Sequence, residues 1–352
     1  MTPRLITLAT AVPPFDLIQD EIAERASRRF APQKGGHEWL LPIFHNAEIR
    51  RRHSVVPIDW FLEEHSFSER NALFIEHATD LLTEVASKAL DQAGLEAEDI
   101  DSIVTVCSSG MASPSLDARI MQRLPFRTDV ERLPLFGLGC AGGVLGLSRA
   151  AALAIAAPLS RVLFLDIELS TLTFRAHDRS KSNLVATALF GDGAAAAIIT
   201  CRDDDQAART APRIGPSGEF TWPDTLDALG WEVADDGLKV VFSLDIPTMV
   251  RHQIRPVVDT FLRKHQLNIH EVDVFVCHPG GAMVLDSLEG AFDLERGALK
   301  HSREALREHG NMSSATVLFI LRAALDAGVK GRCLLTSMGP GFTLGMLILE
   351  TA

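Results

Sequence analysis

Short apolar runs separated by longer, alanine-rich stretches make up most of the chain. The runs are four to six residues long, are rich in Val, Ile and Leu, and mostly lack polar alternation, which is typical of strands buried on both faces of a sheet. The stretches between them have the length of helices. We therefore predict an α/β fold. The expected strands are residues 103–107, 162–165, 194–199, 274–277, 333–336 and 344–349.

Two further apolar segments resemble targeting or membrane elements. Residues 5–12 follow Arg4 but lack the apolar core and small-residue cleavage site of a signal peptide, so we predict a buried first strand. Residues 133–158 are also apolar, but Arg149 interrupts them, whereas a spanning helix needs about 20 apolar residues without a central charge. We predict a buried helix there and no transmembrane segment.

The two parts of the chain resemble each other in order. Residues 95–101 and 267–273 each begin with Leu, end with Asp and precede an expected strand. Farther along, Gly-Cys at 139–140 and Gly-Asn at 310–311 each open a helical stretch. Such an ordered series is the signature of an internal duplication.

The spacing in the two parts agrees as well. Arg161 lies 21 residues after Cys140 (161 − 140), and Arg332 lies 21 residues after Asn311 (332 − 311). Each arginine opens an expected strand, and a Gly-rich turn precedes the last strand of each part. We therefore predict two duplicated halves.

A chain of 352 residues exceeds the usual size of a single hydrophobic core, which agrees with two halves. We place the N-terminal half, with its candidate nucleophile, at residues 1–205 and the C-terminal half at residues 206–352. They meet in the polar stretch 201–223. We interpret its acidic run at 203–205 as a solvated connector and expect no metal site, because the ligands of hard cations are normally spaced apart.

Charge and cysteine content exclude several classes of function. The net charge of −12 argues against a nucleic-acid partner, because phosphate binding requires a clustered positive surface. The five cysteines are an odd number, scattered in apolar contexts without CxxC spacing, so neither a disulfide framework nor a zinc site is expected. We expect a reducing, cytoplasmic compartment.

Cys140 is the candidate nucleophile. It lies between glycines just before a long helical stretch, where the positive end of the helix dipole is expected to lower the pKa of the thiol. The alternative is a buried structural cysteine, the commoner fate of an isolated cysteine. We prefer that alternative for the other four, which end or start apolar runs: Cys107, Cys201, Cys277 and Cys333.

His278 and Asn311 are the other candidates for chemistry. His278 follows an expected strand and precedes Pro-Gly-Gly, and Asn311 starts an apolar helix. Alone, each is more typical of a structural residue or a helix cap. Together with Cys140, however, they occupy strand ends and helix starts that can converge between the two halves.

Five short segments, in order along the chain, resemble the chalcone and stilbene synthase family, the type III polyketide synthases. The resemblance runs from about residue 6 to residue 350. Each segment alone is weak, but the ordered set is highly specific. The segments are GCAGG at 139–143, LFGDGA at 189–194, HPGG at 278–281, GNMSSA at 310–315 and MGPGF at 338–342.

The resemblance implies a fold, an activity and roles for residues. The fold would be the thiolase αβαβα five-layer sandwich, usually a homodimer. Cys140 would take a starter acyl group from acyl-CoA as a thioester, with His278 as the ion-pair partner of its thiolate. His278 and Asn311 would hold the thioester oxygen of malonyl-CoA during loss of CO₂ and stabilise the enolate. No metal, nicotinamide or flavin is implied.

The resemblance also assigns a substrate pocket. Phe190 matches a gatekeeper phenylalanine, although a core aromatic side chain is an alternative, and Val240 stands at the position of a second gatekeeper. Ser113 replaces a methionine that reaches across the dimer in plant enzymes. Small residues here favour long or bulky starters. Residues 39–61 and the GCAGG motif resemble bacterial enzymes that make alkylpyrones or alkylresorcinols from fatty acyl-CoAs. The remaining expected pocket residues are Ser108, Ser170, Thr173, Met338 and Gly339.

The basic residues that plant enzymes use on CoA phosphates are replaced by Trp39, Pro42 and Asn46. Arg50, Arg51 and Arg52 lie close by in sequence and are our candidates for the phosphates. A solvated basic face is the alternative interpretation.

Two other functions remain open. A ketoacyl-ACP synthase III would also use Cys, His and Asn, but usually carries Gln-Ala-Asn after the histidine, where this chain has Pro-Gly-Gly. A catalytically silent partner subunit would have lost one of the three residues. The starter, the number of extensions, the ring closure and delivery by an acyl-carrier protein are left open by the sequence.

Overall fold

The computed structural model describes residues 1–30, 41–202, 207–243 and 245–351. The described residues form one nine-stranded sheet, in the order β11-β12-β13-β8-β1-β7-β6-β4-β5, and two small hairpin-like sheets, β9 with β10 and β2 with β3. The strands are β1 (Arg4–Ala11), β2 (Phe15–Ile18), β3 (Arg51–Ser54), β4 (Ser102–Cys107), β5 (Glu131–Phe136), β6 (Arg161–Leu169), β7 (Asp192–Thr200), β8 (Arg213–Thr221), β9 (Leu229–Ala234), β10 (Gly237–Phe242), β11 (Val274–Cys277), β12 (Gly331–Gly339) and β13 (Thr343–Thr351).

Ten α-helices lie within the described ranges, together with short 3₁₀ turns. The helices are α1 (Gln19–Phe30), α2 (Leu41–His45), α3 (Phe67–Ala93), α4 (Leu116–Ile120), α5 (Gly142–Ala156), α6 (Lys181–Leu189), α7 (Ile246–Lys264), α8 (Ala282–Ala291), α9 (Lys300–His309) and α10 (Thr316–Asp326).

The duplication predicted from the sequence is confirmed by strand pairing. In the N-terminal half β4 pairs with β6 in parallel and β6 with β7 antiparallel. In the C-terminal half β11 pairs with β12 in parallel and β12 with β13 antiparallel. The two sets of strands are joined between β1 and β8 by a single residue pair, Arg4 with Arg213.

The matching segments before β4 and β11 have the same local structure. Each forms a short 3₁₀ turn closed by a capping box, at Ala97–Asp99 and at Ile269–Glu271. The aspartate that ends each segment then accepts a hydrogen bond from the backbone N–H of the arginine in the next parallel strand: Arg161 to Asp101 at 2.8 Å and Arg332 to Asp273 at 2.7 Å. The repeated sequence therefore encodes a repeated strand-to-strand connection.

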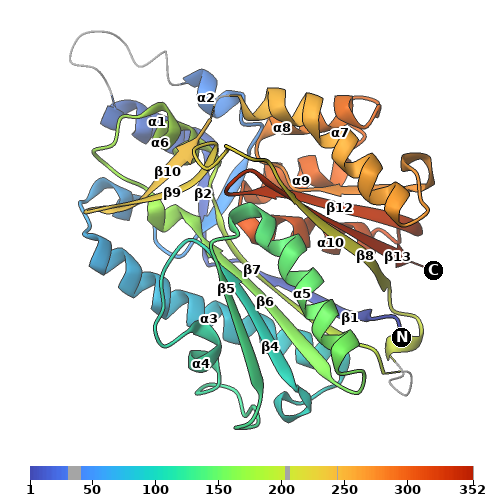
Figure 1. Ribbon diagram of the computed structural model, residues 1–352. Coiled ribbons are helices and arrows are strands. Elements are labelled where there is room, and N and C mark those ends of the chain that lie inside the picture. Colours follow the sequence, from blue (N-terminus) through green and yellow to red (C-terminus); the bar gives the residue numbers. More distant parts are fainter. Residues whose placement is uncertain (31–40, 203–206, 244, 352) are drawn as a thin grey trace.

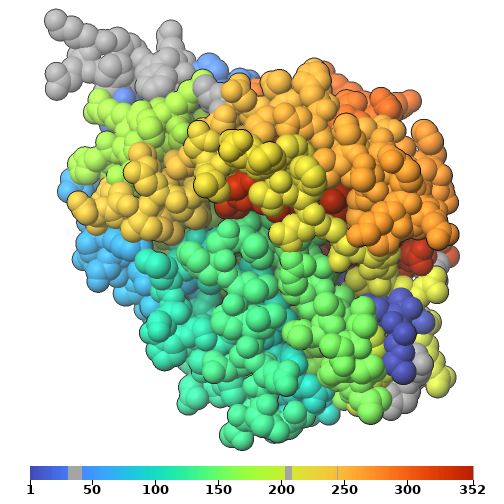
Figure 2. Space-filling view, viewed as in Figure 1, coloured from blue at the N-terminus to red at the C-terminus, as the bar shows by residue number. Residues whose placement is uncertain are grey.

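Helices and strands alternate in layers (Figure 1). Helix α5 contacts strands of both halves, among them β6 and β13, and α10 packs beside it against β1 and β11. Helix α3 covers the outer face of β1, β6 and β7, while α7 and α8 pack together on the opposite side of the molecule. In space-filling view the orange residues of the C-terminal half gather at the upper right, above the green residues of the N-terminal half (Figure 2).

Residues 133–158 only partly match the predicted buried helix. Their first residues belong to β5, an edge strand parallel to β4, and the helix starts at Gly142. Gly137, with φ 87°, separates the two elements. Within the described ranges the segment Gly139–Ala156 is the one helix long and apolar enough to cross a membrane, and 67% of it is buried. Its position between the layers accounts for its apolar composition.

The polar stretch 201–223, where we expect the two halves to meet, contains a strand that was not predicted. Residues 213–221 form β8, which pairs antiparallel with β13 inside the large sheet. Much of β8 is exposed on one side, which explains its polar sequence. The acidic run at 203–205 lies outside the described residues. The predicted strand at 5–12 is confirmed as β1, and the six other predicted strands lie within β4, β6, β7, β11, β12 and β13.

Candidate active site

Cys140, His278 and Asn311 line one cavity. The empty space of this cavity is about 1460 Å³, with open solvent at its mouth included. The three residues come from a turn before α5, the end of β11 and the turn between α9 and α10. The fold therefore brings together the three side chains that the sequence singled out. Other walls are formed by Leu189, Phe242, Met338 and Phe342.

Cys140 lies in a tight turn, the 3₁₀ helix Gly139–Ala141, which continues directly into α5. Gly139 adopts φ 47°, and its backbone N–H donates to the Ser108 hydroxyl at 3.0 Å. Across the turn, a Cβ added to Gly339 would lie 2.3 Å from the carbonyl oxygen of Leu138. Ser108 and Gly339 line neither this cavity nor the second cavity beside Phe190. Their contribution is to shape the turn that presents Cys140.

The thiol of Cys140 does not have the lowered pKa that we expected. Burial raises its pKa to about 12, and a contact at 3.6 Å with the Ser313 hydroxyl lowers it in part. A helix dipole contributes at most about 2 kcal/mol, whereas a rise from 9 to 12 corresponds to about 4 kcal/mol. Burial therefore favours the neutral thiol over the thiolate in the free site. The side chain is partly exposed and lines the cavity.

His278 is buried, and within the described residues neither ring nitrogen has a hydrogen-bond partner. Its backbone N–H donates to Thr336 O at 2.8 Å, which anchors the residue at the end of β11. Burial lowers the pKa of the imidazole to about 3, so the ring is neutral at physiological pH. Buried polar groups are almost always paired. A neutral imidazole with both nitrogens free is therefore suited to a ligand or a transferred proton.

The amide of Asn311 is oriented by its own turn. The backbone N–H of Ser313 donates to Asn311 Oδ1 at 2.8 Å, so the amide NH₂ is directed the other way. The turn is fixed to the end of α6, because Asn311 N–H donates to Leu189 O at 2.8 Å and Gly191 N–H donates to Asn311 O at 3.0 Å. Because Asn311 lines the cavity, its NH₂ is available as a donor there.

Two buried carboxyl groups lie behind this turn. The Ser314 hydroxyl contacts Asp166 Oδ1 at 2.6 Å and Glu168 Oε1 at 2.9 Å, and the backbone N–H of Ser108 donates to Glu168 Oε2. Burial, and for Asp166 the neighbouring Glu168, raises the pKa of both groups. Our sequence analysis missed this pair, since two acidic residues inside an apolar strand give no recognisable motif.

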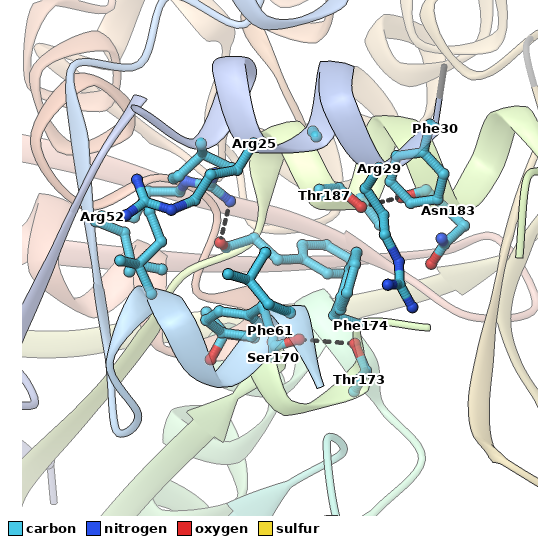
Figure 3. Close-up of a pocket in the computed structure, with 18 of the residues that line it drawn as sticks. Arg25, Arg29, Phe30, Arg52, Phe61, Ser170, Thr173, Phe174, Asn183 and Thr187 are labelled. Carbon is cyan, nitrogen blue, oxygen red and sulfur yellow. Dashed lines mark hydrogen bonds between the residues drawn. The ribbon is translucent and has the colours of Figure 1, made fainter. Parts of the chain in front are cut away.

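A second cavity has Phe190 in its wall, and its empty space is about 740 Å³ with open solvent at its mouth included. Figure 3 shows side chains that line it. The cavity contains four of the predicted pocket residues: Phe190, Ser170, Thr173 and Val240. The Phe190 ring packs against Phe242, which lines the first cavity, with ring centroids 5.8 Å apart. Phe190 therefore lies between the two cavities, as a gatekeeper would, and is also a well-packed aromatic.

The comparisons with known proteins agree with this site. The models of the chalcone and stilbene synthase N-terminal and C-terminal domains match residues 5–203 and 217–352. This chain belongs to the chalcone and stilbene synthase family. A putative chalcone synthase of Bacillus subtilis (strain 168) is 38% identical, with 98% of this chain and 97% of that protein covered. A 1,3,6,8-tetrahydroxynaphthalene synthase of Streptomyces peucetius subsp. caesius is 38% identical over 97% of this chain and 91% of its own length.

Solved structures give the same result. The 1,3,6,8-tetrahydroxynaphthalene synthase of Streptomyces coelicolor A3(2), a bacterial type III polyketide synthase, matches with a TM-score of 0.92 at 30% identity, covering 99% of each chain. The protein is thus a type III polyketide synthase with the thiolase-like fold. It is a transferase that condenses acyl groups with malonyl-CoA with loss of CO₂.

In this synthase the three arginines predicted for the CoA phosphates lie in different surroundings. Arg50 and Arg51 both bind the carboxylate of Glu308. Arg52 is only 3% exposed and donates to Phe190 O at 2.6 Å, so it is not on a surface that CoA phosphates could reach. The expectation for Arg52 is therefore wrong, because the strand β3 turns its side chain into the interior.

Another cation, Lys181, lines the Cys140 cavity of the synthase. Lys181, at the start of α6, lines this cavity, is exposed, and has no carboxylate partner among the residues described. Pro42 and Asn46 also line it, while Trp39 lies outside the described residues. Lys181 carries no sequence signal of its own, since a single lysine at a helix start is common.

Proposed function

We propose that this synthase loads a fatty acyl starter from acyl-CoA onto Cys140, extends it with malonyl-CoA and closes the product to a pyrone or resorcinol-type ring. The observation that carries the proposal is the buried His278, whose two ring nitrogens lack partners in the described chain, beside Cys140 and the oriented amide of Asn311. No metal, nicotinamide or flavin takes part in this chemistry.

In the loading step the neutral imidazole of His278 takes the proton of the Cys140 thiol. The thiolate attacks the acyl-CoA carbonyl, the C–S bond to CoA breaks, and the proton leaves with the CoA sulfur. Because burial disfavours both isolated charges, the thiolate and imidazolium are formed as a pair. The result is an acyl thioester on Cys140 and a neutral His278.

In the extension step His278 and Asn311 donate to the thioester oxygen of malonyl-CoA. Loss of CO₂ leaves its electron pair on the α-carbon as an enolate, and each donor to that oxygen typically contributes a few kcal/mol. The enolate attacks the Cys140 thioester, the new C–C bond forms, and the thiolate of Cys140 is released. The β-ketoacyl-CoA can then return to Cys140 for another round.

The second cavity supports a long starter. It lies behind Phe190, and small residues, Ser170, Thr173 and Val240, leave room beside the aromatic ring. Relatives of the chain include a phloroglucinol synthase of Pseudomonas fluorescens and tetrahydroxynaphthalene synthases of Streptomyces, whose names specify aromatic products. Malonyl-CoA alone is therefore tested beside the fatty acyl-CoAs.

We further infer a cytoplasmic homodimer in which Lys181 contacts CoA phosphates. The support for the dimer is β5, an edge strand whose Phe136 is 58% exposed and whose Leu133 is 36% exposed, since an open apolar edge invites pairing with another copy. Delivery of the starter by an acyl-carrier protein is the alternative to free acyl-CoA.

The test is product analysis by mass spectrometry. Purified enzyme is incubated with malonyl-CoA alone and with acyl-CoAs from acetyl to stearoyl, with the Cys140→Ala variant as control. Pyrones or resorcinols from long starters, absent with the variant, are expected. An aromatic product from malonyl-CoA alone would mean that malonyl-CoA, and not a fatty acyl-CoA, supplies the starter. A single β-ketoacyl product formed only with malonyl-ACP would indicate a ketoacyl synthase. No product with any substrate would indicate a silent subunit.

A further inference from the structure

The second cavity combines apolar walls with arginine side chains. It lies between α1, the 3₁₀ helices Ile58–Leu62 and Ser170–Thr173, and α6 (Figure 3). Most of its wall is hydrocarbon, as expected for an acyl-chain site, yet it also contains three arginines, Arg25, Arg29 and Arg52. The apolar wall includes Leu17, Ile22, Phe30, Phe61, Phe174 and Val240.

Arg52 is the deepest of the three arginines and is incompletely paired. One guanidinium nitrogen, Nη1, donates to the carbonyl oxygen of Phe190, while Nε and Nη2 are buried with no hydrogen-bond partner in the described chain. The carboxyl group of Asp192 attracts Arg52, but its own hydrogen bonds come from Thr171 and Val55. Buried donors without partners are costly. Two free N–H groups in a fork geometry match a carboxylate.

Arg29 adds a second unpaired cation at the outer part of the cavity. It lies on α1 and, among the described residues, makes no ion pair, whereas Arg25 on the same helix pairs with Asp59 at 3.2 Å and Glu21 at 3.6 Å. Glu21 and Asp59 are thus already paired with Arg25. The cavity as a whole presents an excess of positive charge to whatever enters it.

We propose that this cavity binds an apolar chain that ends in a carboxylate, with Arg52 donating two hydrogen bonds to the carboxylate and Arg29 attracting it electrostatically. This ligand has two candidate sources. It is either a free fatty acid or the far end of an ω-carboxy acyl group carried on Cys140, and the second source rests on the proposed function. Because Arg52 also holds the Phe190 carbonyl, the bound carboxylate lies against the wall that separates the two cavities.

The first experiment measures binding without catalysis. Isothermal titration of the full-length protein compares octanoate with octan-1-ol, a neutral chain of the same length. We expect octanoate to bind about ten- to hundredfold more tightly, the range for hydrogen bonds between a buried cation and a carboxylate. Arg52→Met should remove this preference and Arg29→Gln should reduce it. Arg28→Gln is the matched control, since Arg28 is exposed, pairs with Glu24 and does not line the cavity.

Equal binding of octanoate and octan-1-ol, or unchanged octanoate binding in a folded Arg52→Met variant, would overturn the proposal. If Arg52→Met does not fold, as judged by circular dichroism, the proposal is tested by two other measurements. These are octanoate binding to Arg29→Gln and the comparison of octanoate with octan-1-ol in the wild type. An octanoate preference that Arg28→Gln reduces as much as Arg29→Gln does would also overturn it, because the charge effect would then be non-specific.

A second experiment separates the two sources. Turnover of octanoyl-CoA is compared with that of the mono-CoA thioester of octanedioic acid. A kcat/KM ratio that favours the diacid thioester, and that falls about tenfold or more in Arg52→Met, assigns the site to the acyl chain on Cys140. No such preference, with octanoate binding intact, assigns it to a free fatty acid. If neither thioester is used, the proposed function fails, while the octanoate titration still decides the site.

Discussion

The hydroxyl of Ser313 contacts the sulfur of Cys140, and we expect it to influence the reactivity of the thiol. It lies 3.6 Å from the sulfur and lowers the pKa of the thiol against the larger effect of burial. Ser313→Ala removes this contact alone. Ser313 has φ 48°, a backbone conformation in which Ser and Ala are similarly strained, so the substitution changes little else. We expect the variant to fold normally and to have a Cys140 thiol with a higher pKa.

The size of the change follows from the geometry. A hydrogen bond to a charged group contributes about 1.5–3 kcal/mol, and the 3.6 Å distance favours the lower value. About 1.5 kcal/mol corresponds to about one pKa unit, and hence to about tenfold less thiolate at pH 7. A thiolate of higher pKa is intrinsically more nucleophilic, with a Brønsted coefficient of about 0.4–0.5. The net rate of alkylation at pH 7 should therefore fall about three- to fourfold.

The assay is the pH dependence of Cys140 alkylation by iodoacetamide, followed on the Cys140 peptide by mass spectrometry. Cys107 in the same protein serves as an internal reference, and Ser87→Ala, on the outer helix α3, is the matched control. The reasoning is refuted if the apparent pKa of Cys140 is unchanged or falls in Ser313→Ala, or if Ser87→Ala shifts it equally.

Four further outcomes are expected. Gly339→Ala should cost about 1–3 kcal/mol in chemical denaturation and slow Cys140 acylation, because the new Cβ would meet Leu138 O at 2.3 Å. Burial raises the pKa of Asp192 to about 7, against about 3.9 in an unfolded chain, so its contribution to stability is present at low pH and is lost as pH rises to 7. Between pH 5 and pH 8 the wild type should lose about 2–3 kcal/mol that Asp192→Asn does not lose, measured by urea unfolding. Phe136→Lys on the edge strand β5 should convert a dimer to a monomer in light scattering. Lys181→Ala should raise the KM for malonyl-CoA a few-fold, with kcat kept and with the effect reduced by salt.

Each expectation has a result that contradicts it. Wild-type stability and acylation in Gly339→Ala would show that the turn can move aside. Parallel stability profiles for the wild type and Asp192→Asn would place the pH dependence in other groups. An unchanged mass for Phe136→Lys would move the interface away from β5. An unchanged KM for Lys181→Ala would assign the CoA phosphates elsewhere. Lys239→Ala is the control, since Lys239 pairs with Glu232 and lines neither cavity.

Much of the active site was predictable because its signals are local. Cys140 between glycines, His278 at a strand end and Asn311 at a helix start occur in repeated contexts, and the cavity contains all three. The strands of the two halves were predictable for the same reason, since an apolar run reports burial whatever its neighbours are. Ser313 was missed although its segment was quoted, because a contact with Cys140 depends on how residues 140 and 313 meet in space.

The sequence by itself determined the duplicated α/β plan, the family and the three candidate residues, Cys140, His278 and Asn311, that the fold brings to one cavity. Tertiary structure alone decided that residues 213–221 pair within the sheet, that burial raises the pKa of the Cys140 thiol, and that Arg52 points inward beside Phe190. Patterns along the chain record which positions are apolar and which turns are tight. Desolvation, charge pairing and cavity shape are set instead by residues distant in sequence. The run Arg50, Arg51 and Arg52 therefore does not itself report which of its side chains face solvent and which line a cavity.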